Sequence, residues 1–214
     1  MSTEPDHAAR LAALGGDALA QLADAHRARE EALARCRETI RACGLSIRAI
    51  HRLEPDQASH LSAEAEASLR RAQRALEPFP ALAAAGFLHD AEKEYAEARL
   101  TQALVAGDAL KSAQDLSVGL AAWLNGLAEA ASELRRHLLD RLRQGNVGRA
   151  EELLVAMEDV YDLLVTIDYP DAITGGLRRT TDALRAVLER SRSDLTTTVL
   201  QVSLQQAIEA SLER

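Results

Sequence analysis

Apolar residues recur in a regular pattern through the first quarter of the chain. Between Leu33 and Ile50 they are spaced alternately three and four residues apart, which is the spacing of one face of an α-helix. The pattern predicts a long helix that begins at Asp17, a suitable N-cap after two glycines, and ends near Leu53. Its apolar face would consist of Leu33, Cys36, Ile40, Cys43, Ile47 and Ile50.

Turn-forming residues divide the rest of the chain into further helical segments. The prolines at positions 55, 78, 80 and 170 mark boundaries, because proline is tolerated at a helix start and disfavoured inside one. Residues 1–16 are expected to be flexible or to form a short extra helix, and residues 107–118 to interrupt the helical pattern. The predicted helices cover residues 55–76, 82–106, 120–144 and 149–167, and a last one follows Pro170, with a kink at Gly175 and Gly176.

The composition supports an all-helical fold. Alanine and leucine dominate the 214 residues, aromatic residues make up 3%, and no segment alternates polar and apolar positions as a half-buried strand would. A chain of this length suits one domain with a substantial core. We therefore predict an all-α protein, with residues 1–214 forming a single multihelical domain of six or seven helices.

Charge, cysteine content and hydropathy bear on the ligands and the location of the protein. The formal net charge is −8, yet arginine accounts for all of the 25 basic residues except Lys93 and Lys111, so a phosphate ligand is permitted but not indicated. A GC-rich genome would produce the same arginine bias. Cys36 and Cys43 continue the apolar face and are expected in the core. Without a secretory signal or a run of 18 apolar residues, we expect a cytoplasmic protein with no membrane contact.

Two acidic patterns are the strongest candidates for chemistry. Asp90, Glu94 and Glu97 would project from one side of a helix, and Glu129 and Glu133 are spaced i, i+4 on a later one. Carboxylates from two adjacent helices suit a hard cation such as Mg²⁺ or Mn²⁺. The alternative is that these acids form solvated helix faces, and spacing alone does not separate the two.

Other metal chemistries find less support. A ferritin-like di-iron bundle needs Glu-x-x-His on two helices, and the sequence offers one match, from Glu4 to His7, with a proline inside it. The six histidines form no zinc-binding spacing, and only His89 adjoins the acidic residues of its segment. We expect the histidines at the surface or at its boundary.

From about Arg27 onward the chain resembles the translin/TRAX family of helical nucleic-acid-binding proteins. The segment Asp168–Arg179, with the sequence DYPDAITGGLRR, is the most specific match. Residues 29–52, 86–98 and 126–134 carry the rest of the likeness. The resemblance implies a translin-like subunit that assembles into a closed, hollow homo-oligomer, an octamer in this family.

The family likeness also implies a metal site. TRAX, the catalytic partner of translin, carries a Glu-Tyr-x-Glu-Ala element whose glutamates bind metal, and these match Glu94 and Glu97. A second element, Gly-x-Ala-Asp-x-x-x-Glu-Leu, matches Glu129 in place of the aspartate and Glu133 at its final acid. The longer Glu129 side chain keeps the charge and puts the catalytic competence of the site in question.

The resemblance thus implies a metal-dependent endoribonuclease that acts on single-stranded RNA, or on single-stranded DNA, with Mg²⁺ or Mn²⁺ held by the four glutamates. The alternatives are a translin-like octamer that binds single-stranded nucleic acid without cleaving it and, third, a helical scaffold for protein partners. Arginine groups would neutralise phosphates within the assembly. These candidates are Arg70, Arg71, Arg74, Arg135, Arg136, Arg178 and Arg179.

Overall fold

The computed structural model describes residues 7–212, and α-helix is the only regular secondary structure within that range. This confirms the all-α class. Two four-residue helices, α3 (Pro80–Ala83) and α7 (Asp171–Thr174), accompany the long ones. The six long helices are α1 (His7–His51), α2 (Pro55–Leu76), α4 (Phe87–Ala106), α5 (Leu120–Arg143), α6 (Val147–Val165) and α8 (Leu177–Leu212).

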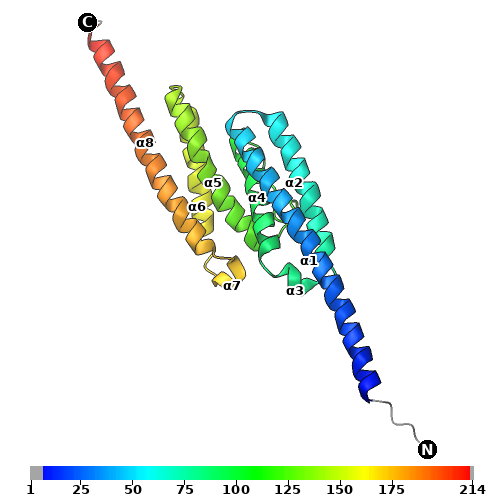
Figure 1. The fold of residues 1–214 in the computed structure, drawn as a ribbon. Helices are drawn as coiled ribbons and strands as arrows, with labels where there is room; N and C mark the ends of the chain where they lie inside the picture. Colours follow the sequence, from blue (N-terminus) through cyan, green and yellow to red (C-terminus); the bar gives the residue numbers. More distant parts are fainter. Residues whose placement is uncertain (1–6, 213–214) are drawn as a thin grey trace, which may run out of the picture.

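The long helices form two groups that meet at α4 and α5. Helices α1, α2 and α4 pack against one another, and so do α5, α6 and α8. The contact between α4 and α5 joins the two groups near the centre of the molecule (Figure 1). The first part of α1 and the last part of α8 project from the bundle at opposite ends. Any site built on α4 and α5 therefore lies at the centre of the fold.

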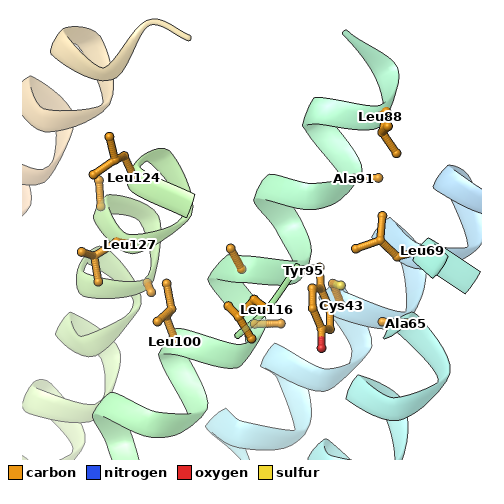
Figure 2. Close-up of a cluster of buried hydrophobic side chains, with 14 of the residues drawn as sticks. Cys43, Ala65, Leu69, Leu88, Ala91, Tyr95, Leu100, Leu116, Leu124 and Leu127 are labelled. Atoms are coloured by element: carbon orange, nitrogen blue, oxygen red, sulfur yellow. The ribbon is translucent and has the colours of Figure 1, made fainter. Parts of the chain in front are cut away.

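Leucine, alanine and one tyrosine fill the core around α4. Tyr95 and Leu100 are fully buried, and so is Leu116, which lies in the loop after α4. Figure 2 shows Tyr95 beside Cys43 and Leu69, where α4 faces α1 and α2, and Leu100 toward α5. Small residues and leucines fill the space between these helices. This packing fixes which face of α4 remains for polar residues.

The helix boundaries differ from the prediction at three places. Helix α1 runs without a break through Gly15 and Gly16, so the start predicted at Asp17 was wrong; the alanines and leucines around the glycines offset a cost of about 1 kcal/mol for each. The prediction for residues 1–6 lies outside the described residues. The helix end near Leu53 and the interruption at 107–118 are confirmed.

The other two differences follow from glycines with positive φ. Helix α4 begins at Phe87 rather than near position 82, because Gly86 (φ 92°) separates it from α3. Gly175 and Gly176 (φ 62° and 83°) do not kink one helix but end α7 before α8 begins.

Asn146 caps α6 by accepting a hydrogen bond from the backbone N–H of Arg149.

Both cysteines are free and buried, as predicted, and burial raises the pKa of Cys36 to about 11. Among residues 7–212, no helix combines the length and the apolar content needed to cross a bilayer.

Candidate metal centre

The acidic face of α4 is turned toward α5. Tyr95, Ala96 and Ala98 are buried in the packing of α4. Glu94 and Glu97 lie three residues apart on the side that meets α5, and Glu97 is only 8% exposed. Glu92, on the opposite side of α4, holds this helix to α2 and to the start of α5. Its carboxylate accepts hydrogen bonds from the Gln73 side chain and from the Gly119 backbone N–H. The carboxylates of Glu94 and Glu97 therefore lie at a helix interface.

Gly126 allows the two helices to approach closely at this point. A Cβ at position 126 would lie 2.8 Å from the carbonyl oxygen of Lys93 and 2.9 Å from the backbone nitrogen of Glu97. Only a residue without a side chain fits against that backbone. Glu129, one turn further along α5, consequently faces the two glutamates of α4.

Three of the four predicted glutamates come together. One carboxylate oxygen from each of Glu94, Glu97 and Glu129 lies within 4.8 Å of the other two. Oxygens bound to one Mg²⁺ at about 2.1 Å lie at most about 4.2 Å apart across the ion, so small side-chain rotations suffice for all three to share a cation. The donor set and its spacing fit a hard divalent ion.

The pKa of Glu97 is raised well above that of an ordinary glutamate. Burial is the largest cause and raises its pKa to about 8, and the negative charges of Glu129, Glu94 and Glu133 add to the effect. Within residues 7–212 no hydrogen bond reaches its carboxylate. A buried carboxyl without a hydrogen-bond partner is costly as an anion, which is the condition that a bound cation would relieve.

Lys93 places a positive charge among these acids. Its Nζ donates to both carboxylate oxygens of Glu129, at 2.7 and 2.8 Å, and lies 3.5 Å from Glu94. Burial opposes the charge on Lys93, but the hydrogen bonds to Glu129 and the surrounding carboxylates outweigh it, so its pKa is raised. No role for Lys93 was predicted from the sequence, although it is one of only two lysines and precedes Glu94 directly.

Glu133, the fourth predicted acid, is engaged differently. Its Oε2 lies 2.6 Å from Nε2 of His51 on α1, and Nδ1 of His51 lies 3.1 Å from Nε2 of His137 on α5. The His137 residue is buried, so its expected position at the surface or its boundary was wrong, whereas His51 lies at the boundary with its side chain turned inward. Burial lowers the pKa of His137 to about 4. No spacing in the sequence pairs these histidines, because they lie on helices far apart along the chain.

Two residues predicted near the site lie elsewhere. Asp90 is exposed near the start of α4 and is not part of the three-glutamate cluster. The ring of His89 instead meets the turn after α7, where a Cβ on Gly175 would lie 3.0 Å from it. Asn125 ties the same turn to α5 by donating to the carbonyl oxygen of Thr174. The segment 168–179 therefore packs against α4 and α5 and contributes no residue to the three-glutamate cluster.

The predicted arginines divide into two groups. Arg70 donates to the carbonyl oxygens of Leu116 and Ser117, and Arg135 pairs with Asp194 at 2.8 Å, so both hold parts of the fold together. The other five are exposed, and their guanidinium groups make no hydrogen bond or ion pair within the described part of the chain. These five are Arg71, Arg74, Arg136, Arg178 and Arg179.

Of the exposed arginines, Arg136 has the simplest relation to the cluster. It follows Glu129 by seven residues on α5, which places it on the same side of the helix and about 10 Å along the axis. Arg71 and Arg74 line a groove between α1 and α2, and Arg178 lines a hollow beside Asp168. The structure does not gather the predicted arginines into one patch.

No family model matches the chain. An uncharacterized protein of Methanocaldococcus jannaschii is 28% identical over 187 residues, which cover 86% of this chain and 82% of that protein.

Solved structures give a closer comparison. The crystal structure of AfC3PO is 31% identical, with a TM-score of 0.80 over 87% of this chain and 97% of that one. The complex of AfC3PO with duplex RNA gives 31% identity and a TM-score of 0.79, over 87% and 96% of the two chains. Apo-NeC3PO, at 18% identity and a TM-score of 0.75 over 92% and 100%, shares the fold. Because the chain is 31% identical to AfC3PO and the match covers almost all of AfC3PO, the chain belongs to the translin/TRAX family.

Proposed function

We propose that this protein is a metal-dependent endoribonuclease that binds and hydrolyses single-stranded RNA inside an oligomeric shell. The observation that carries the proposal is the buried residue Glu97, whose carboxylate lies with those of Glu94 and Glu129 and accepts no hydrogen bond from residues 7–212. Mg²⁺ or Mn²⁺ held there would lower the pKa of a bound water and stabilise charge on the scissile phosphate.

The side chains of this chain have distinct tasks in the proposal. Glu94, Glu97 and Glu129 would bind the cation, and Glu133, held by His51, is the fourth acid, close enough for its charge to raise the pKa of Glu97. Arg136 would hold a phosphate of the strand about two helical turns away along α5. With six aromatic residues in 214, binding would rest on phosphate contacts and discriminate little between sequences.

Nucleic-acid binding is supported by the family. AfC3PO, which is 31% identical, has been solved in complex with duplex RNA. Single-stranded DNA is a second candidate substrate, because the metal-bound acids would act on the phosphodiester and contact no 2′-hydroxyl in our scheme. A non-catalytic octamer that only binds nucleic acid is the competing function, and the ion pair of Lys93 with Glu129 favours it, since it occupies a proposed ligand.

Assembly completes the proposal. Leucines at the projecting ends of α1 and α8 are exposed, among them Leu14, Leu22, Leu204 and Leu212. Apolar surface of this kind is typical of contacts between subunits. We infer a homo-oligomer, an octamer by family likeness, whose interior would hold the strand.

Incubation of labelled RNA with the purified protein tests the function. Cleavage should require Mn²⁺ or Mg²⁺, stop with EDTA and be lost in Glu97→Gln, with single-stranded RNA, duplex RNA and single-stranded DNA compared in parallel. Asp90→Asn is the matched control, because Asp90 is an exposed acid of the same helix outside the cluster. Binding without cleavage under all metal conditions would leave the non-catalytic octamer as the function.

A further inference from the structure

Lys93 neutralises part of the three-glutamate cluster. Its Nζ contacts both oxygens of Glu129 and also lies near Glu94, and its side chain is only 21% exposed. An ammonium group in such a position is attracted to the same oxygens as a divalent ion. It is also fixed to α4 by its own backbone and cannot diffuse away.

Glu97 is left outside this ion pairing. The Glu97 residue is only 8% exposed, and its carboxylate accepts no hydrogen bond from the described residues. Lys93 makes its close contacts with Glu129 and Glu94 instead. The cluster therefore consists of one carboxylate without a partner and two that already share a cation.

We propose that Lys93 determines how tightly this site binds a divalent ion, by competing for Glu129 and Glu94 and by repelling the ion that enters beside Glu97. The inference rests on the proposed function, because it takes the three acids to be metal ligands. To gain all three ligands, an ion has to draw Glu129 and Glu94 away from Lys93. Like charges a few ångströms apart in a partly buried site interact strongly, so the effect on affinity is large.

The proposal has a consequence for how the enzyme works. With Lys93 in place, the acids repel one another less, and the interface between α4 and α5 does not depend on a bound metal for its stability. The site then binds metal weakly and responds to metal concentration rather than remaining saturated. Lys93 is in this sense a residue that sets metal affinity and is not itself a ligand.

Calorimetric titration of the EDTA-treated, dialysed full-length protein with Mn²⁺ tests this. Lys93→Met removes the charge and keeps the length of the side chain, and we expect it to bind Mn²⁺ at least about tenfold more tightly than the unaltered protein. Lys111→Met is the matched control, since it removes the other lysine, which is exposed on the loop before α5. Its affinity should equal that of the unaltered protein.

A second variant and a second measurement distinguish the effect of the lost charge from a loss of the fold. Lys93→Gln removes the charge but can still donate a hydrogen bond to Glu129, and it should also bind more tightly. Circular dichroism in EDTA checks that each variant is helical, and Mn²⁺ should raise the melting temperature of both Lys93 variants more than that of Lys111→Met.

The outcomes separate this inference from the proposed function. Folded Lys93 variants that bind Mn²⁺ as the unaltered protein does, or more weakly, overturn the role of Lys93 and leave the metal site standing. If neither they nor the unaltered protein binds Mn²⁺, the three acids are not a metal site, and the proposed function fails together with the inference.

Discussion

Nε2 of His51 lies 2.6 Å from Oε2 of Glu133, and this contact joins the end of α1 to the acidic side of α5. The His51 side chain is 6% exposed, whereas that of Glu133 is 34% exposed, so the histidine holds the carboxylate from its buried side. His137 completes the arrangement, because its Nε2–H can donate to Nδ1 of His51, which leaves the Nε2–H of His51 to donate to Glu133.

The first prediction follows from this contact. If Glu133 joins the three glutamates as a ligand, His51→Phe, which removes the donor that orients it, should lower metal affinity by about 10- to 100-fold. His51→Gln can still donate and should restore part of the affinity. Calorimetry with Mn²⁺ measures both, with His26→Phe, an exposed histidine of the same helix, as the control. Equal affinities for all four proteins would show that Glu133 needs no support from His51.

The second prediction concerns pH and stability in the absence of metal. The pKa of Glu97 is raised from 4.5 to about 8, so the folded state holds a proton that the unfolded state releases between those values. Stability from this group is complete below pH 4.5 and is lost as pH rises toward 8. Glu97→Gln should therefore raise the free energy of unfolding at pH 8 by roughly 4 kcal/mol and change it little at pH 4.5.

Urea unfolding in EDTA at the two pH values measures this difference. Glu77→Gln, at an exposed position after α2, serves as the control and should show no pH-dependent gain. A gain from Glu97→Gln that is the same at both pH values would mean that Glu97 titrates normally.

The helices could be predicted from the sequence because local signals specify them. The 3,4-spacing from Leu33 to Ile50, the proline at position 55 and the glycine at 145 each lie within a few residues of the boundary that they indicate. Where two local signals conflict, as at Gly15 and Gly16 within a run of good helix formers, the prediction was wrong. The assignment of residues 1–214 to one domain stays a prediction.

The site could be predicted only in part, because its geometry depends on contacts between distant segments. Three of the four predicted acids come together. They could be predicted because the spacing of Glu94 and Glu97 puts both on one helix face and the family likeness adds Glu129 to them. The ion pair of Lys93 and the bond from His51 to Glu133 depend on how α1, α4 and α5 cross. No pattern within a single helix encodes that crossing.

The third prediction tests the helix crossing at Gly126. Gly126→Ala puts a Cβ within 3 Å of backbone atoms of α4, which cannot move aside as a flexible side chain would. We expect a loss of about 1–3 kcal/mol in the free energy of unfolding and a weaker affinity for Mn²⁺. Gly44→Ala is the control within α1, where an added Cβ meets nothing within 4 Å, and it should stabilise by up to about 1 kcal/mol. Equal stabilities of the two variants would contradict the close approach.

The fourth prediction concerns Arg136 and RNA. If Arg136 holds one phosphate, Arg136→Ala should weaken RNA binding similarly for all sequences and reduce the slope of log affinity against log salt by about 0.7–1. Fluorescence anisotropy at several salt concentrations measures the slope. Arg190→Ala removes an exposed arginine of α8 that we assign no role. A salt slope that changes equally in both variants would point to a general charge effect rather than a phosphate contact.

The last prediction concerns assembly through the end of α8. Leu204 and Ile208 are 62% and 50% exposed and lie one turn apart on one side of the helix. Two glutamates at these positions, Leu204→Glu with Ile208→Glu, should lower the mass measured by light scattering toward the 23.1 kDa of one subunit. The helices of the subunit should persist, because neither side chain is buried in its core, and exposed substitutions usually change stability by about 0.5 kcal/mol or less. Ser203→Glu with Gln206→Glu adds the same charge away from that side of α8 and should leave the assembly intact. An unaltered protein that already has the mass of a single subunit at micromolar concentration would overturn the oligomeric shell, and with it the enclosed strand.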